Sequence, residues 1–334
     1  MTANLTPEFR AAEERFRAAT TPEEKLEALD DMLATIPKHK GTEKMQGDIK
    51  RRIAKLRDET QRRSASKRRP FYLVEKQGAG QIVLVGPPNS GKSQLLASLS
   101  NAEPEIAPYP FTTRAPLTGM VQFENVQIQL VDLPPLAPEG SPPWLIQVIR
   151  PADAIVLVFD LGDDNLLDHF ETTLTLLENG RVYVGAAATD PGVTVFRKKA
   201  VIVGNKLDAP GAADRLDLLM EACEGIFPAQ VRGESPVLPV SATMGSGLEE
   251  LKRRMYDVLG VIRVYTKAPG KPVDDSAPFV LKKGATILEA ASTVHKEIAQ
   301  RLKYARVWGK STYEGQMVQR DYVLSEGDIV EFHT

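Results

Sequence analysis

The residues best suited to chemistry lie at positions 86–93, which read GPPNSGKS. They match the G-x-x-x-x-G-K-[ST] pattern of a phosphate-binding loop, with an apolar run at 82–85 before it and a helix-favouring segment at 94–99 after it. Gly86 and Gly91 allow the backbone to curve around a polyphosphate, while successive N–H groups and the helix N-terminus face its negative charge. The spacing therefore predicts a strand, a phosphate-binding loop and a helix.

Four side chains of this loop have separate expected roles. Lys92 is expected to reach the β- and γ-phosphates, and Ser93 to bind Mg²⁺. Ser90 is expected to line the nucleotide. Asn89 is expected to contact it too, although an asparagine in a tight turn also serves simply to form a local backbone bond.

Two further positions complete the predicted magnesium site. The segment 108–114 has no helical or strand period, and a threonine on such a loop can close over the γ-phosphate and bind Mg²⁺. Thr113 is the first choice for this role and Thr112 the second. Asp132 ends the alternating run 126–131, where an aspartate is expected to hold Mg²⁺ through one of the ion's waters.

The base specificity is predicted from the sequence NKLD at 205–208. The carboxylate of Asp208 can accept from both the ring N–H and the exocyclic amine of guanine, and adenine offers no such pair of donors. Each charge-assisted bond contributes about 1.5–3 kcal/mol, which is enough to select guanine. A backbone N–H of the SAT sequence at 241–243 could read the guanine oxygen. The predicted guanine contacts are Asn205, Lys206, Asp208, Ser241, Ala242 and Thr243.

The elements that position these motifs follow from apolar runs. Runs at 82–85, 154–159 and 200–203 have the length and composition of strands buried on both faces, and a helix is expected near 165–178. Strands of this kind alternating with helices favour a parallel sheet in an α/β fold, with ligands at its carboxyl edge.

The region before the loop, residues 1–70, is expected to be helical. Thr6 and Thr21 precede proline and glutamate in the pattern of helix N-termini. Residues 38–69 hold 13 basic and 4 acidic side chains, with apolar residues at helical spacing, so we expect a basic amphipathic helix ending near 64–66. The excess charge favours a nucleic-acid contact, and the alternative is a solvated helix face.

The C-terminal part, residues 269–334, begins in a proline- and glycine-rich linker and continues as a small sheet with one helix. Thr286 and Glu289 form a capping-box pattern, and the apolar positions predict one helix continuing to Leu302. Short strands are expected around 278–281, 305–308 and 328–332. This pattern fits a β-grasp arrangement.

Composition sets broad limits on the class of protein. The chain has 334 residues, of which 42% are hydrophobic and 26% charged, and a net charge of −2. It contains no apolar run of membrane-spanning length and no signal-peptide pattern at its start, so we expect a cytoplasmic protein without a membrane partner. Cys223 is the only cysteine, which excludes an intrachain disulfide, and we expect it to be a core residue.

Taken together, these motifs resemble those of the Obg-related GTPases, and residues 36–43, 261–267 and 304–309 are similar to the developmentally regulated GTP-binding proteins. The resemblance extends from about Lys38 to Thr334. It implies a Ras-like P-loop G domain over 71–268, a TGS domain over 269–334, and a Mg²⁺-dependent GTPase that associates with ribosomes or structured RNA. It also implies K⁺ as a candidate cofactor at Asn89 and a protein regulator as a candidate partner.

One departure from the family pattern affects catalysis. The family has Asp-x-Pro-Gly where this chain has Pro135, and proline offers no N–H to the γ-phosphate. Losing such a bond costs about 1.5–3 kcal/mol, or roughly tenfold to a hundredfold in rate. Leu136 cannot orient water as glutamine does. No catalytic residue is identified, so we predict a slow GTPase, or alternatively a GTP-responsive RNA-binding protein with little hydrolysis; Asp208 argues against an ATP-using enzyme.

Overall fold

The computed structural model describes most of the chain in two compact units, Met1–Pro70 and Phe71–Thr334, and each unit is considered by itself. The described residues are 6–19, 22–37, 42–67, 70, 72–100, 105–106, 115–185, 194–224, 226, 235–268, 270–271, 273, 278–309 and 313–334. Within these residues, no helix has both the length and the apolar composition that crossing a bilayer requires.

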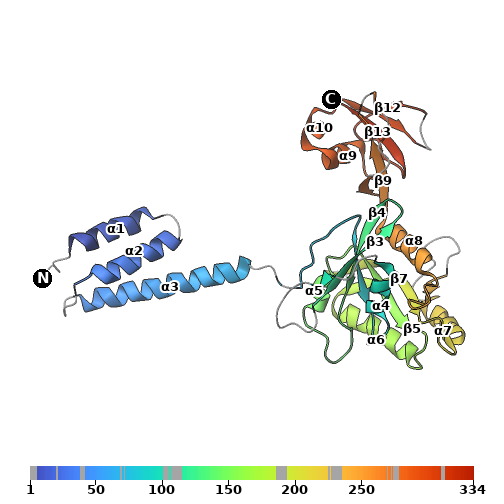
Figure 1. Ribbon diagram of the computed structural model, residues 1–334, viewed down its shortest axis with the longest axis horizontal. Helices are drawn as coiled ribbons and strands as arrows, with labels where there is room; N and C mark the ends of the chain where they lie inside the picture. The colour runs from blue at the N-terminus through green and yellow to red at the C-terminus, as the bar shows by residue number, and fades with distance from the viewer. Residues whose placement is uncertain are drawn as a thin grey trace. The chain divides into compact units, whose positions relative to one another are not determined.

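The first unit consists of three helices, α1 (Pro7–Ala18), α2 (Pro22–Thr35) and α3 (Glu43–Lys67) (Figure 1). Thr6 caps α1 by accepting from the Phe9 N–H at 3.2 Å, as its sequence pattern predicts. One apolar stripe of each helix faces a shared core: Phe9, Ala12, Leu29, Met32, Ile36, Ile49 and Ile53. The basic helix does not end at 64–66 as expected, because it continues to Lys67.

The second unit contains an α/β domain built on an eight-stranded sheet, counted over the described residues, in the order β2-β3-β4-β1-β5-β7-β6 with β8 beside β7. Its strands are β1 (Gln81–Val85), β2 (Glu105–Ile106), β3 (Leu117–Phe123), β4 (Val126–Asp132), β5 (Ala154–Asp160), β6 (Val182–Val184), β7 (Phe196–Asn205) and β8 (Val237–Pro239). Strands β4, β1, β5 and β7 run parallel. Their carboxyl ends therefore meet at one edge of the sheet.

Alternate side chains of β1 enter two separate cores, which explains why that run is continuously apolar. Val83 and Val85 pack in the core covered by α5 (Leu145–Ile149), α6 (Leu166–Asn179) and α7 (Ala212–Glu224). Ile82 and Leu84 pack in the core covered by α4 (Lys92–Leu99) and α8 (Leu248–Leu259). The domain thus has three layers, with helices on both faces of the sheet (Figure 1).

The C-terminal domain has a mixed sheet in the order β10-β9-β13-β11-β12. Its elements are β9 (Val261–Thr266), β10 (Phe279–Lys282), α9 (Ile287–Val294), α10 (Lys296–Arg301), β11 (Tyr304–Trp308), β12 (Gln316–Val318) and β13 (Asp328–His333). The capping box of Thr286 and Glu289 is present. The expected single helix is instead two, because His295 is extended at φ −165° and its ring accepts from the Glu297 N–H, which begins α10.

The segment 261–266 also differs from the sequence interpretation, which treated it as a linker ahead of a boundary at residue 268. It forms β9, paired with β10 and β13 in the second sheet. The alternation of Ile262 and Val264, both buried, with more exposed neighbours is a strand pattern. The two domains meet beside it, where Arg263 donates to Glu326 at 2.6 Å and to Asn125 of the β3–β4 turn at 3.0 Å.

Candidate functional site

The loop at 86–93 lies at the carboxyl end of β1 and requires glycine at both ends. A Cβ on Gly86 would lie 2.2 Å from the Val158 carbonyl oxygen, and one on Gly91 would lie 2.3 Å from the Asn205 amide nitrogen. Gly91 also has φ 86°, a left-handed conformation that side chains other than glycine rarely adopt. The two glycines are thus required by close packing within the protein itself.

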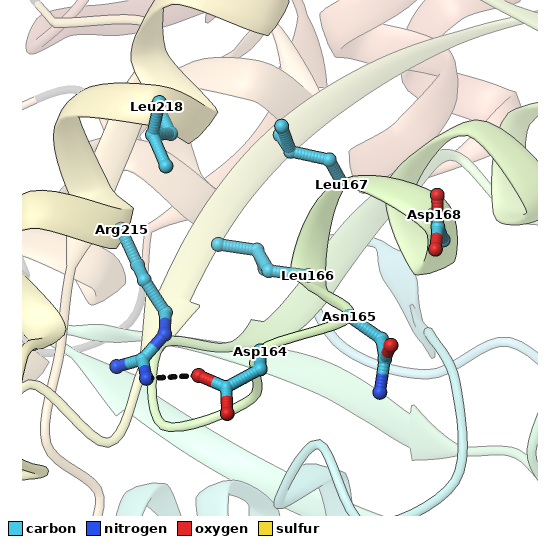
Figure 2. A pocket seen from close by; sticks show the side chains of 7 residues that line it. All are labelled: Asp164, Asn165, Leu166, Leu167, Asp168, Arg215 and Leu218. Carbon is cyan, nitrogen blue, oxygen red and sulfur yellow. Dashed lines mark hydrogen bonds and ion pairs between the residues drawn. The ribbon is translucent and has the colours of Figure 1, made fainter.

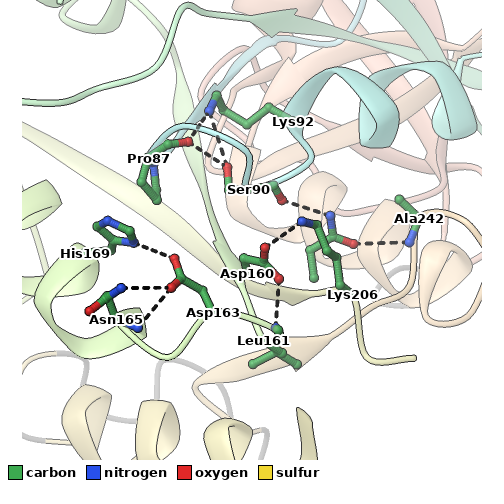
Figure 3. Close-up of polar contacts among 12 residues, drawn as sticks. Pro87, Ser90, Lys92, Asp160, Leu161, Asp163, Asn165, His169, Lys206 and Ala242 are labelled. Carbon is green, nitrogen blue, oxygen red and sulfur yellow. Dashed lines mark hydrogen bonds and ion pairs between the residues drawn. The ribbon is translucent and has the colours of Figure 1, made fainter. Parts of the chain in front are cut away.

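Lys92 reaches back over the loop instead of pointing to solvent (Figure 3). Its ammonium donates to the carbonyl oxygens of Gly86 at 3.0 Å and Pro87 at 2.8 Å, and to the Ser90 hydroxyl at 3.3 Å. Burial lowers the pKa of Lys92 to about 8, and the charge of Asp132 partly opposes this shift. The loop therefore holds a cation ready for an anion without a close ion pair.

Ser93 and Asp132 form the second part of the site. The Ser93 hydroxyl donates to Oδ2 of Asp132, while Oδ1 of Asp132 is buried and has no hydrogen-bond partner among the described residues. Burial raises the pKa of Asp132, and the Ser93 hydrogen bond and Lys92 charge oppose the rise. A hydroxyl beside a carboxylate oxygen that lacks a partner is an all-oxygen set, which suits a hydrated hard cation such as Mg²⁺.

Asn205 ties together two loops that are distant in sequence. Its amide donates to the Ser90 carbonyl at 3.0 Å, and its Oδ1 accepts from the Ala242 N–H at 3.2 Å (Figure 3). Because the side chain is 2% exposed, both bonds lie inside the protein. The structure thus gives Asn205 a positioning role between the phosphate loop and the loop that begins at Ser241.

Asp208 and Lys206 lie on the turn after β7. The Asp208 carboxylate accepts from the Ser241 hydroxyl, which in turn accepts from the Met244 N–H at 3.1 Å. Lys206 has φ 63° and pairs with Asp160 at 2.5 Å (Figure 3). These bonds orient the carboxylate and the lysine stem at the same edge of the sheet as the phosphate loop.

The structure leaves some predicted residues apart from this network. Thr112 and Thr113 lie outside the described residues. Asn89 is exposed and has φ 61°, a conformation that asparagine tolerates better than most residues, so a turn alone accounts for its presence. Thr243 is also exposed.

Sequence reasoning missed two contributors to the site. Asp160, the partner of Lys206, directly follows the apolar run of β5, so its place at the carboxyl edge was available from the sequence. Pro87 takes part through its carbonyl oxygen, which any residue would supply, so no sequence signal could have identified it.

The segment after Asp132 is packed against the loop. The Leu136 N–H donates to the Gly86 carbonyl oxygen at 3.0 Å, and Leu133 and Leu136 are 2% and 5% exposed. The Ser141 hydroxyl closes the segment by accepting from the Ala137 N–H at 2.8 Å. Leu136 is therefore a core residue, and its N–H is already engaged.

Comparison with known proteins agrees with this geometry. Residues 81–211 match the family model described as 50S ribosome-binding GTPase, and residues 262–334 match the TGS domain model. The second match begins at the start of β9, consistent with that strand belonging to the C-terminal sheet.

Similar proteins cover almost the whole chain. An uncharacterized GTP-binding protein of Methanocaldococcus jannaschii is 28% identical over 359 residues, covering 92% of both chains. Developmentally-regulated GTP-binding protein 2 of Mus musculus is 27% identical over 361 residues, covering 92% of this chain and 98% of the mouse protein. The Arabidopsis thaliana Developmentally-regulated G-protein 1 is 28% identical over 372 residues, covering 92% of this chain and 90% of its own.

Among solved structures, the YchF GTPase of Schizosaccharomyces pombe has the same fold, with a TM-score of 0.51 and 13% identity over 79% of this chain and all of that one. The family models, the relatives and the fold agree with one another. The chain therefore carries a GTPase domain followed by a TGS domain, and over about nine tenths of its length it is similar to the developmentally-regulated GTP-binding proteins.

Proposed function

We propose that this protein binds GTP with Mg²⁺, hydrolyses it slowly and acts on ribosomes or structured RNA. The observation that carries the nucleotide part is the meeting of two groups of side chains at one sheet edge. Lys92, Ser93 and Asp132 lie where phosphates and a cation would bind, and Asn205 and Asp208 lie where a guanine would bind. We propose the further contacts predicted from the sequence as well: Gly86, Asn89, Ser90, Gly91, Lys206, Ser241, Ala242, Thr243 and Thr113.

Mg²⁺ would be held by Ser93, by Thr113 and, through a water, by Asp132, and would neutralise phosphate charge. The orphaned Oδ1 of Asp132 supports this assignment, since a buried carboxylate oxygen without a donor is costly. The sequence-based domain limits are 1–70, 71–268 and 269–334, and we propose to move the second boundary to residue 260, so that β9 belongs to the TGS domain.

The segment after Asp132 supports the proposal of slow hydrolysis. Pro135 has no N–H, and the next N–H, from Leu136, is bonded to Gly86. The Leu136 side chain is buried in the core and has no polar atom with which to orient water. Pro135 cannot donate the backbone N–H that a glycine would give to the γ-phosphate. Leu136 cannot orient the attacking water as a glutamine does in other GTPases.

The same packing predicts that this segment does not switch between nucleotide states. We expect amide hydrogen exchange over 133–141 to be the same with GDP and with a non-hydrolysable GTP analogue, because Pro135 has no N–H and the Leu136 N–H is bonded to Gly86. Exchange over 109–116, which includes Thr113, is expected to change. Pro135→Gly should restore neither switching nor hydrolysis, because the Leu136 hydrogen bond and burial still hold the segment and prevent the new N–H from moving to the γ-phosphate. State-dependent protection confined to 133–141 would contradict this.

A bound K⁺ beside Asn89 would add positive charge at the phosphates to that of Lys92. We expect GTP hydrolysis to be at least about tenfold faster in K⁺ than in Na⁺ at constant ionic strength, because a fixed cation stabilises charge in the transition state. Asn89→Gly, which keeps the left-handed turn but removes the amide, is expected to abolish the difference. Equal rates in both salts would remove K⁺ from the mechanism.

RNA or ribosome binding is supported by α3 and by the 50S ribosome-binding description of the matching family model. Lys44, Lys50, Arg51, Arg52 and Lys55 are exposed on this helix, and Arg51 pairs with Asp48. Exposed cations of this kind are available to neutralise phosphates and release counterions.

Reversing three of these charges, in Lys50→Glu/Arg52→Glu/Lys55→Glu, is expected to weaken binding to purified ribosomes. The slope of log affinity against log salt should fall by about 0.7–0.9 for every phosphate that the variant no longer neutralises. The control is a variant with the same change of charge in the TGS domain, Lys282→Glu/Lys283→Glu/Lys303→Glu. An equal loss of affinity in both variants would mean that ribosome binding is not specific to α3.

The second candidate is a GTP-responsive RNA-binding protein that barely hydrolyses, favoured by Pro135 and by the buried Leu136. Single-turnover hydrolysis of bound GTP, with and without ribosomes, separates the two. Hydrolysis that ribosomes accelerate supports the first. Tight binding of GTP with no hydrolysis under either condition supports the second.

A further inference from the structure

A cavity of about 260 Å³ lies between the start of α6 and α7, outside the nucleotide site. Figure 2 shows its lining, with Leu167 and Leu218 at the rim and the Arg215 side chain extending toward Asp164. The full lining is Asp164, Asn165, Leu166, Leu167, Asp168, Arg215 and Leu218. None of these residues takes part in the proposed function.

The size and lining suit one apolar side chain. The volume is below the range of about 300–1,000 Å³ that is usual for small-molecule sites. Leu167 is 37% exposed and Leu218 is 48% exposed, whereas Leu166 is 3% exposed. Two exposed leucines beside a buried one form the kind of apolar pocket that receives an anchor residue in a protein interface.

The walls of the cavity are held in place. Leu166 and Phe170 of α6 and Leu219 and Cys223 of α7 are buried in one core. The Arg215 guanidinium donates to the carbonyl oxygens of Leu161 at 3.2 Å and Pro210 at 2.9 Å, and pairs with Asp164. Docking there would therefore need little ordering of the protein, which favours affinity.

The charge around the cavity is negative on both helices. Leu218 has Asp214 four residues before it and Glu221 three residues after it, and Leu167 has Glu171 four residues after it, spacings that place these side chains beside the leucines on the helix surface. Asp214, Glu221 and Glu171 are exposed, as are Asp164 and Asp168. Arg215 is the only lysine or arginine on either helix, and it is already paired.

We propose that this cavity and its acidic rim form a docking site for a partner protein, which inserts an apolar side chain from a cationic amphipathic segment. Negative charge around an apolar pocket attracts such a segment and repels RNA, which would meet like charge. The cavity is thus a protein-binding surface distinct from the basic helix and independent of nucleotide binding.

The test uses the full-length protein and two labelled synthetic helical peptides, one of leucine and lysine and one of leucine and glutamate in the same order. We expect the lysine peptide to bind and to protect residues 164–168 and 215–218 from hydrogen exchange. Leu218→Ser should weaken it at least about tenfold, the loss typical of an interface anchor. Asp168→Asn/Glu171→Gln should weaken it and reduce its salt dependence.

Leu288→Ser in the TGS domain is the matched control, because Leu288 is 40% exposed on another helix. Leu288→Ser should leave the affinity for the lysine peptide unchanged. Leu218→Ser should leave GTP affinity unchanged, and this second result separates the cavity from the nucleotide site. The proposal is overturned if Leu218→Ser and Leu288→Ser bind the lysine peptide alike, if the glutamate peptide binds equally well, or if protection appears elsewhere only.

Discussion

Asp208→Asn is expected to weaken GTP binding by roughly a hundredfold and to improve the binding of xanthosine triphosphate. Asparagine loses the charge and one acceptor oxygen, and its NH₂ group faces a guanine donor. The loss of a charge-assisted bond costs about 1.5–3 kcal/mol, and each 1.4 kcal/mol is tenfold in affinity. Xanthine presents a carbonyl where guanine has its amine, so the new NH₂ group regains a partner.

The measurement is equilibrium binding of GTP, ATP and xanthosine triphosphate to the unaltered protein and the variant. Ser241→Ala is an informative companion, since it removes the hydroxyl that donates to Asp208 and should loosen guanine selectivity less than Asp208→Asn does. Asp321→Asn, an exposed aspartate of the TGS domain, is the control for a simple change of net charge. If GTP and ATP bind the unaltered protein equally, the guanine assignment fails.

GDP affinity is expected to fall by up to about tenfold per pH unit above pH 8, because of Lys92. Burial lowers the pKa of Lys92 to about 8 in the nucleotide-free protein. A bound phosphate stabilises the ammonium and raises that pKa, so at higher pH the protein must take up a proton in order to bind. Well below pH 8, Lys92 is protonated in both states and contributes no pH dependence.

Calorimetry in buffers with different ionisation enthalpies measures this proton uptake directly, and none is expected near pH 6.5 from this group. Lys92→Met should lose roughly tenfold to a hundredfold in GDP affinity, since it removes a charge-assisted bond to the β-phosphate. Lys198→Met is the matched control, because burial also lowers the pKa of Lys198, which donates to the Ala152 carbonyl oxygen away from this loop. Flat affinity between pH 8 and 9.5 would contradict the role given to Lys92.

The sequence alone determined the parts of this protein that depend on neighbouring residues. The phosphate-binding loop needs glycines, lysine and serine at fixed spacing, because a turn and a helix N-terminus are built from consecutive backbone groups. The capping box of Thr286 and Glu289 is local for the same reason, and it appears as predicted. Periodicity likewise identified the buried strands, since it reports which face of a segment is apolar.

The spacing of apolar residues does not predict which partner a buried face or a polar group will contact. Those contacts are decided by the tertiary structure. The Asn205 side chain donates a hydrogen bond to the carbonyl oxygen of Ser90, 115 residues earlier in the chain. It also accepts a hydrogen bond from the N–H of Ala242, 37 residues later. The strand at 261–266 reads as a linker until its partners β10 and β13 are known. The hydrogen bond from the Leu136 N–H to the Gly86 carbonyl oxygen and the burial of Leu133 and Leu136 likewise depend on long-range packing, which no local pattern specifies.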